Sequence, residues 1–184
     1  MANGFRIAFD DSGDGRKHPK VQTDLRKHPV AETIEEVMTF RLQRLVAIGE
    51  RAGRDWSQRM FDLSLNEWRL LALVNSRAPA RAGGLADFLL MDKSRTSRVT
   101  KSLLKKRLIR SFPDPDDGRA IALEPTESGV ALYRRVFAEV MRSNERVLEV
   151  LNSDEVRALD AILHKLTEHN SKLLEMRLGR PLMR

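Results

Sequence analysis

The sequence of 184 residues contains no cysteine, and this absence removes several kinds of chemistry at once. Disulfide bonds, thiol redox sensing, cysteine nucleophiles and cysteine-ligated zinc sites are all excluded. There are four histidines, and His164 and His169 stand five residues apart, a spacing that does not place two ligands on one helix face. The sequence therefore predicts no metal site.

Common enzyme motifs and long apolar runs are absent as well. The sequence has no G-x-S-x-G nucleophile motif and no Gly-rich phosphate loop. It predicts neither an enzyme nor a bound cofactor. No stretch approaches the roughly 18 apolar residues of a membrane-spanning helix, and the first residues contain no apolar run of signal-peptide length. We expect a cytoplasmic protein with no membrane partner.

Positive charge, in contrast, is concentrated in one short segment. The formal net charge of the chain is +7. Residues 91–110, "MDKSRTSRVTKSLLKKRLIR", contain eight Lys or Arg residues and one acid, Asp92. Such a local excess favours a polyanionic partner, nucleic acid above all. The alternative is a charged, solvated helix face that has no partner.

The hydrophobic pattern divides the chain into three kinds of region. Residues 1–32 are rich in Gly, Asp, Pro and Lys and predict an N-terminal tail, flexible or partly helical. Residues 33–62 and 126–178 carry apolar stripes at helical spacing and predict a helical dimerisation region, since a lobe this small cannot bury them all. Residues 63–125 predict a compact lobe that contains the basic segment.

Capping signals predict where the helices begin. Thr33 with Glu36, and Ser64 with Glu67, have the spacing of a capping box, in which each side chain accepts from the other's free backbone N–H. The first helix is expected to end at about Gly53. Asp92 is a good N-cap for the basic segment.

The basic segment follows a short apolar helix, "LADFLL", and a tight turn, which is the layout of a helix-turn-helix. On a helix, Thr96, Val99 and Leu103 share the inward face. Arginine can donate two hydrogen bonds to a guanine edge, and Lys or Ser can contact phosphate. The candidate DNA-binding residues are Lys93, Ser94, Arg95, Ser97, Arg98, Lys101 and Lys105.

A β-hairpin is predicted directly after this helix. "LIRSF" and "AIALE" are short alternating runs separated by "PDPDDG", whose Pro, Asp and Gly residues favour a turn. Asp117 stands two residues before Arg119 and has the chemistry to hold that guanidinium in one pose for the DNA minor groove. The alternative is an ordinary turn, because turns use these residues anyway.

The order of these pieces resembles the MarR family of bacterial winged-helix repressors. The resemblance covers about residues 34–176, and its most specific parts are Asp114–Ala120, which is similar to the family's wing, and "LEPTESG", which is similar to its strand-to-helix junction. It implies a homodimer on a pseudo-palindromic double-stranded DNA operator. Ser94, Arg95, Ser97 and Arg98 match the positions that enter the major groove, and Asp117 would orient Arg119.

Three residues depart from the family pattern. Leu90 stands where the family often has a small residue in the turn, and Arg107 replaces the Gly that usually ends the recognition helix. Gly118 stands where the wing often carries a second Arg. The first two departures concern the residues at which the helices end, and the third weakens the expected minor-groove contact.

The resemblance also implies an effector site for a small aromatic carboxylate or phenol. Trp56, Met60 and Trp68 are the candidate lining residues, and Arg41 or Arg44 of the first helix is a candidate partner for a carboxylate. The alternative is that both tryptophans belong to the core and both arginines to the surface.

Together these patterns predict a mainly α fold with a small β-wing: a winged helix-turn-helix domain plus a helical dimerisation domain. The expected function is a sequence-specific DNA-binding transcriptional regulator, a homodimeric repressor relieved by the effector. The alternative function is a non-specific architectural DNA-binding protein.

Overall fold

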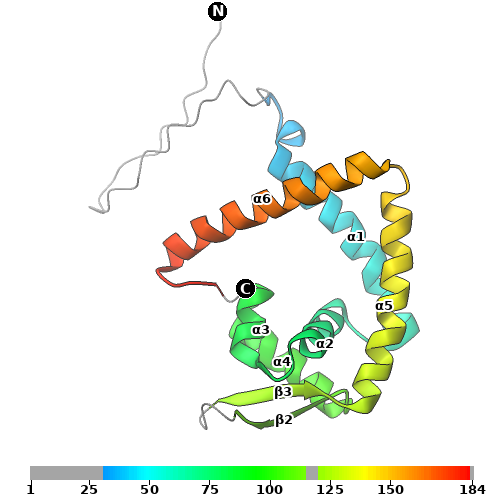
Figure 1. The fold of residues 1–184 in the computed structure, drawn as a ribbon, viewed down its shortest axis with the longest axis vertical. Coiled ribbons are helices and arrows are strands. Elements are labelled where there is room, and N and C mark those ends of the chain that lie inside the picture. The colour runs from blue at the N-terminus through cyan, green and yellow to red at the C-terminus, as the bar shows by residue number, and fades with distance from the viewer. Residues whose placement is uncertain (1–30, 115–119, 183–184) are drawn as a thin grey trace, which may run out of the picture. The chain divides into compact units, whose positions relative to one another are not determined.

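The computed structural model describes residues 31–114 and 120–182. Their elements follow one another as a short 3-10 helix (Ile34–Glu36), α1 (Met38–Phe61), α2 (Leu65–Arg77), β1 (Ala80–Arg81), α3 (Ala82–Phe88), α4 (Lys93–Lys105), β2 (Ile109–Pro113), β3 (Ile121–Pro125), α5 (Glu127–Leu148) and α6 (Ser153–Leu178) (Figure 1). The fold is mainly helical with one small antiparallel sheet, as the sequence predicts. Within the described ranges, no helix is long and apolar enough to cross a membrane.

The described part of the chain divides into two units, and the boundary lies between Gln43 and Arg44. In the first unit the predicted capping box at Thr33 is wrong. Thr33 makes no side-chain capping bond, and the Glu36 carboxylate accepts instead from the backbone N–H of Glu32 at 2.8 Å. Val37 adopts an extended conformation with ψ of 120°, which ends the 3-10 helix and leaves α1 to begin at Met38.

The first long helix also runs further than predicted, through Gly53 to Phe61. A glycine inside a helix costs about 1 kcal/mol relative to alanine, but a buried contact anchors the helix beyond Gly53. Ser57 is fully buried and its hydroxyl donates to the Leu63 carbonyl at 2.8 Å. The helix ends where Asp62 adopts a positive φ of 51°.

In the second unit, α2 lies at the centre of the core. Its predicted capping box is confirmed: Glu67 N–H donates to Ser64 Oγ at 3.3 Å, and Ser64 N–H donates to Glu67 Oε2 at 2.7 Å. Leu70, Leu71 and Val74 are completely buried. They belong to one core with buried residues of α3, α4, the sheet and α5, namely Leu85, Val99, Leu103, Ile109, Leu123 and Val136.

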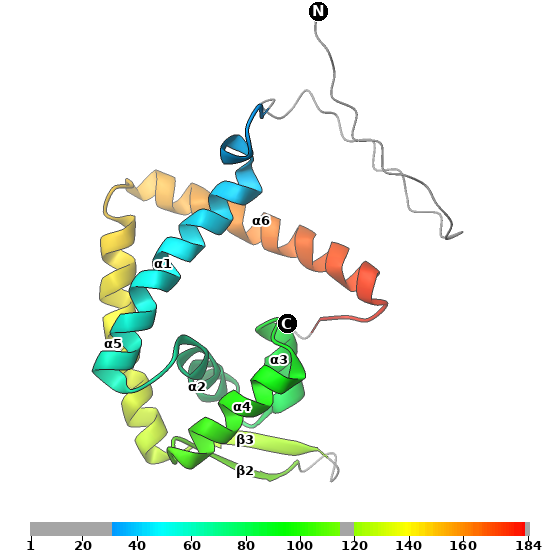
Figure 2. The ribbon, with the colours of Figure 1, turned by 180° about the vertical axis from the view of Figure 1, so that it is seen from behind.

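The predicted hairpin is present as β2 and β3, with Ser111 opposite Leu123. A third strand was not predicted: β1 pairs with the other edge of β3, with Ala80 also opposite Leu123. Only two residues long, β1 is too short to show an alternating pattern. Figure 2 shows α3 and α4 beside this sheet, with α4 leading into β2.

Two residues that depart from the family pattern have left-handed backbone conformations. Leu90 has a φ of 52° and Arg107 a φ of 56°. Glycine adopts this region without a Cβ penalty, whereas other L-residues lose about 1–2 kcal/mol there. The end of α4 is therefore strained at Arg107.

We expect Arg107→Gly to stabilise the protein by about 1 kcal/mol and to raise the melting temperature by roughly 2–4 °C. The matched control is Lys105→Gly inside α4, where glycine should lower stability by about 1 kcal/mol. Thermal unfolding followed by circular dichroism compares the two variants. A melting temperature of Arg107→Gly below that of the parent would contradict the assigned strain.

Candidate nucleic-acid interface

Helix α4 begins at a well-defined cap. The Asp92 side chain accepts from the backbone N–H of Arg95 at 2.7 Å, as the sequence predicts. This hydrogen bond is the main reason that the pKa of Asp92 lies below its ordinary value, and the charges of Arg95 and Arg98 add to it. The one acid of the basic segment thus serves as the N-cap of α4.

The two faces of α4 have opposite character. Thr96, Val99 and Leu103 are buried, which confirms the predicted inward face. The side chains of α4 proposed to contact DNA are exposed: Lys93, Ser94, Arg95, Ser97, Arg98, Lys101 and Lys105. The helix therefore presents a cationic outer face with Arg, Lys and Ser donors, which are the groups that read bases and bind phosphates.

A buried carboxylate fixes α4 against α2. Glu67 is 6% exposed and accepts from Ser102 Oγ at 2.6 Å and from Lys106 Nζ at 3.0 Å. Burial alone would raise the pKa of Glu67, but hydrogen bonds from Ser102, Ser64 and Lys106 outweigh it and hold the pKa below the ordinary value. Lys106 Nζ also donates to the Asp62 carbonyl after α1. The network ties the end of α1, α2 and α4 together.

The base of the wing contains an ion pair that sequence reasoning missed. Asp114, expected at the hairpin tip, is 7% exposed and accepts two hydrogen bonds from Arg81 of β1, at 2.7 and 2.8 Å. The partners are 33 residues apart, so no local pattern links them. The pairing neutralises one acid of the wing. Asp117 and Arg119 lie outside the described residues.

The candidate effector residues are placed in different surroundings. Trp56 is half-buried against Phe61, with ring centroids 5.3 Å apart, whereas Trp68 stacks on Tyr133 at 5.8 Å. Met60 is 62% exposed. The two tryptophans thus belong to separate aromatic pairs.

The two candidate arginines of α1 are also in different settings. Arg41 Nε donates to the Glu35 carbonyl at 3.0 Å within the first unit. Arg44, in the second unit, lines a cavity along α1 with Arg51, Arg54 and Asp55. Arg44 therefore has arginine neighbours that would favour an anion.

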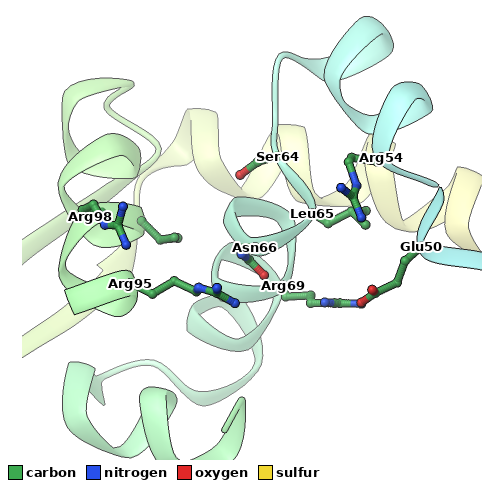
Figure 3. Close-up of a pocket in the computed structure, with 9 residues that line it drawn as sticks. Glu50, Arg54, Ser64, Leu65, Asn66, Arg69, Arg95 and Arg98 are labelled. Carbon is green, nitrogen blue, oxygen red and sulfur yellow. The ribbon is translucent and has the colours of Figure 1, made fainter. Parts of the chain in front are cut away.

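A cavity beside α4 brings in further residues that the sequence did not single out. Arg95 and Arg98 line it from α4, together with Asn66 and Arg69 of α2 and Arg54 of α1 (Figure 3). Asn66 and Arg69 are half-buried, as expected of side chains at the edge of a core helix. Asn66 and Arg69 belong to no sequence motif. Only the packing of α2 on α4 identifies them as residues that line this cavity.

A capped helix with a cationic face, a preceding short helix and an antiparallel wing define a winged helix-turn-helix DNA-binding protein. Residues 63–121 match the model of the MarR family. Residues 63–121 of the chain therefore carry a MarR-family domain of the DNA-binding, winged helix-turn-helix type. Its relatives in the family are transcriptional regulators and not enzymes.

The similarity to individual proteins extends beyond the matched domain. The uncharacterized HTH-type transcriptional regulator YxaD of Bacillus subtilis is 27% identical over 142 residues, 77% of this chain and 95% of its own. The HTH-type transcriptional repressor NicR of Pseudomonas putida is 23% identical over 79% of this chain and 89% of its own. A MarR/EmrR family regulator from Acinetobacter sp. ADP1 has a similar fold, with a TM-score of 0.70 and 24% identity over 76% of this chain and 99% of its own.

Proposed function

We propose that this protein is a homodimeric repressor that binds a pseudo-palindromic operator and leaves it when a small aromatic carboxylate or phenol binds. The observation that carries the DNA-binding part is the exposed cationic face of α4 opposite its buried inner face. Arg95 and Arg98 read base edges, while Lys101 and Lys105 contact phosphates. Lys93, Ser94 and Ser97 complete the contacts at the start of the helix.

The relative NicR is named a transcriptional repressor, and this supports the proposal that DNA binding by this protein represses transcription. In the wing, Asp117 holds Arg119 for the minor groove, as the family resemblance implies. Buried pairing of Asp114 with Arg81 supports the approach of the wing to DNA, since the charge of this acid is neutralised within the protein.

Exposed apolar side chains on the long helices support the proposal that a second copy of the chain is the partner in a homodimer. Leu45, Val46 and Ile48 of α1 are 59–62% exposed. The helices α5 and α6 expose several more, namely Phe137, Met141, Val147, Ile162, Leu163, Leu166, Leu173 and Met176. Many exposed large apolar side chains on several helices are typical of an obligate interface. Two-fold symmetry then places the two recognition helices about one DNA turn, roughly 10 base pairs, apart.

The effector part of the proposal rests on the family resemblance and on the cationic surroundings of Arg44. Arg41 or Arg44 would pair with the carboxylate, and Trp56, Met60 or Trp68 would contact the ring. No cofactor or metal ion is part of the proposal. In the described ranges, no group of three or more His, Asp or Glu residues is placed to hold a metal ion.

Substitution of two α4 residues tests the assigned roles. Arg98→Ala should lose about 1–3 kcal/mol of binding free energy and relax the preference at one position of each half-site. Lys105→Ala should weaken binding to all sequences alike and reduce the salt slope by about 1, because a phosphate contact releases counterions without reading a base. Titrations against a set of operator variants at several salt concentrations separate the two. Identical behaviour of the two variants would show that the roles are assigned wrongly.

A further inference from the structure

The arginine-lined cavity beside α4 has a volume of about 580 Å³. Its walls come from α1, from the start of α2 and from the exposed side of α4 (Figure 3). The lining is mostly charged or polar: Glu50, Arg54, Ser64, Leu65, Asn66, Arg69, Arg95, Arg98 and Val99. Four arginines and one glutamate therefore meet in a single cavity next to the proposed DNA-binding face.

Much of this positive charge is not neutralised by the protein. Arg69 Nη2 contacts Glu50 Oε1 at 2.8 Å, and in Figure 3 its side chain reaches across from α2 to α1. Arg95 has only a loose contact to Asp92, at 3.9 Å. Among residues 31–114 and 120–182, neither Arg54 nor Arg98 forms a salt bridge with an acid. The cavity thus favours an anion with several oxygen atoms.

We infer that this cavity receives a phosphate of the DNA backbone, with Arg69 and Arg54 as positioning contacts outside the recognition helix. The inference rests on the proposed entry of α4 into the major groove. Phosphates line both edges of that groove, so the backbone must pass beside α4 when Arg98 reaches a base. The planar fork of arginine matches phosphate oxygens, and Asn66 adds an amide donor in the same cavity.

Glu50 has a separate role in this arrangement. In the free protein it pairs with Arg69, and the two side chains are 36% and 42% exposed, so the pair is accessible to solvent. An incoming phosphate must compete with this carboxylate for the same guanidinium. Glu50 therefore lowers the affinity for DNA. Because Glu50 lies on α1, the position of α1 sets how strongly this carboxylate competes with the phosphate.

The experiment measures binding of the full chain to its selected duplex and to an unrelated duplex, by fluorescence anisotropy at several salt concentrations. Arg69→Ala should weaken binding to both duplexes about 10-fold and reduce the salt slope by about 1, with base preference unchanged. Arg69→Lys should restore part of the loss. Arg59→Ala is the matched control: it removes an exposed arginine of α1 that does not line the cavity.

A double-mutant cycle tests the competition. Glu50→Gln should tighten binding about 3-fold in the parent and have no effect in the Arg69→Ala background, because the freed guanidinium is then missing. Equal tightening in both backgrounds would overturn the role of Glu50, since it would reflect only the loss of a negative charge. Thermal unfolding of each variant shows that the fold is retained.

Two results would overturn the phosphate contact itself. One is an Arg69→Ala variant that binds both duplexes as Arg59→Ala does, while Arg98→Ala still loses affinity. The other is that citrate raises the melting temperature of the parent but not of Arg69→Ala, while Arg69→Ala binds DNA as the parent does. The cavity would then hold a small polyanion and not a DNA phosphate. A parent protein that selects no sequence at all would instead count against the proposed function.

Discussion

Replacing Gly129 with alanine should destabilise the protein by about 3 kcal/mol or more, a large value for a single added methyl group. A Cβ at this position would lie 1.9 Å from the carbonyl oxygen of Leu108 and 2.9 Å from its carbonyl carbon. Both atoms are backbone, so no side chain can move to relieve the clash. The first turn of α5 would have to separate from the segment that joins α4 to β2.

That segment is held by several bonds that the clash would break. Thr126 N–H donates to the Leu108 carbonyl at 3.1 Å, and the hydroxyls of Thr126 and Ser128 donate to the Arg107 carbonyl at 2.8 and 3.0 Å. Thermal unfolding should show a fall of roughly 10 °C for Gly129→Ala. Gly83→Ala is the control, because nothing lies within 4 Å of its added Cβ. Near-equal melting temperatures for the two variants would contradict the tight junction.

The second large effect concerns the dimer. The double variant Leu163→Glu/Leu166→Glu should be monomeric by sedimentation and should bind the operator at least about 100-fold more weakly. Both side chains lie on α6 and are 40–44% exposed, on the apolar face proposed to meet a second copy. Two linked recognition helices gain about 10²–10⁴ in avidity over one, and separating the protomers removes that gain.

His164→Glu provides the control for the added charge. His164 is exposed on the same helix but, at 3.6 residues per turn, faces away from Leu163 and Leu166. This variant should remain dimeric and bind DNA as the parent does. A parent that sediments as a monomer, or a double variant that remains a dimer with full affinity, would show that the apolar face serves another purpose.

Local signals in the sequence predicted much of the DNA-binding lobe. Two helix caps depend on residues only three positions apart: the capping box of Ser64 with Glu67, and the N-cap at Asp92. Both caps are present as predicted. The inward face of α4 follows from helical spacing alone. The same reasoning failed at Thr33, because a capping spacing does not ensure that the backbone continues as a helix; the extended Val37 interrupts it.

Features that join distant residues were not predictable from one sequence. The Arg81–Asp114 pair and strand β1 depend on the register of the sheet. Glu67 was identified as a capping residue, but its bond to Ser102 needs the packing of α2 on α4. For the same reason the sequence did not single out Arg54 and Arg69, since only the fold places them beside Arg95 in one cavity.

The most direct test of the central claim is selection of bound fragments from random DNA by the chain of 184 residues. A homodimeric, sequence-specific regulator should enrich one pseudo-palindromic motif whose half-sites lie roughly 10 base pairs apart. Repeating the selection with Arg98→Ala should blur one position in each half-site. Recovery of unrelated fragments with no shared motif, at an affinity that depends only on salt, would contradict the claim and favour an architectural DNA-binding protein.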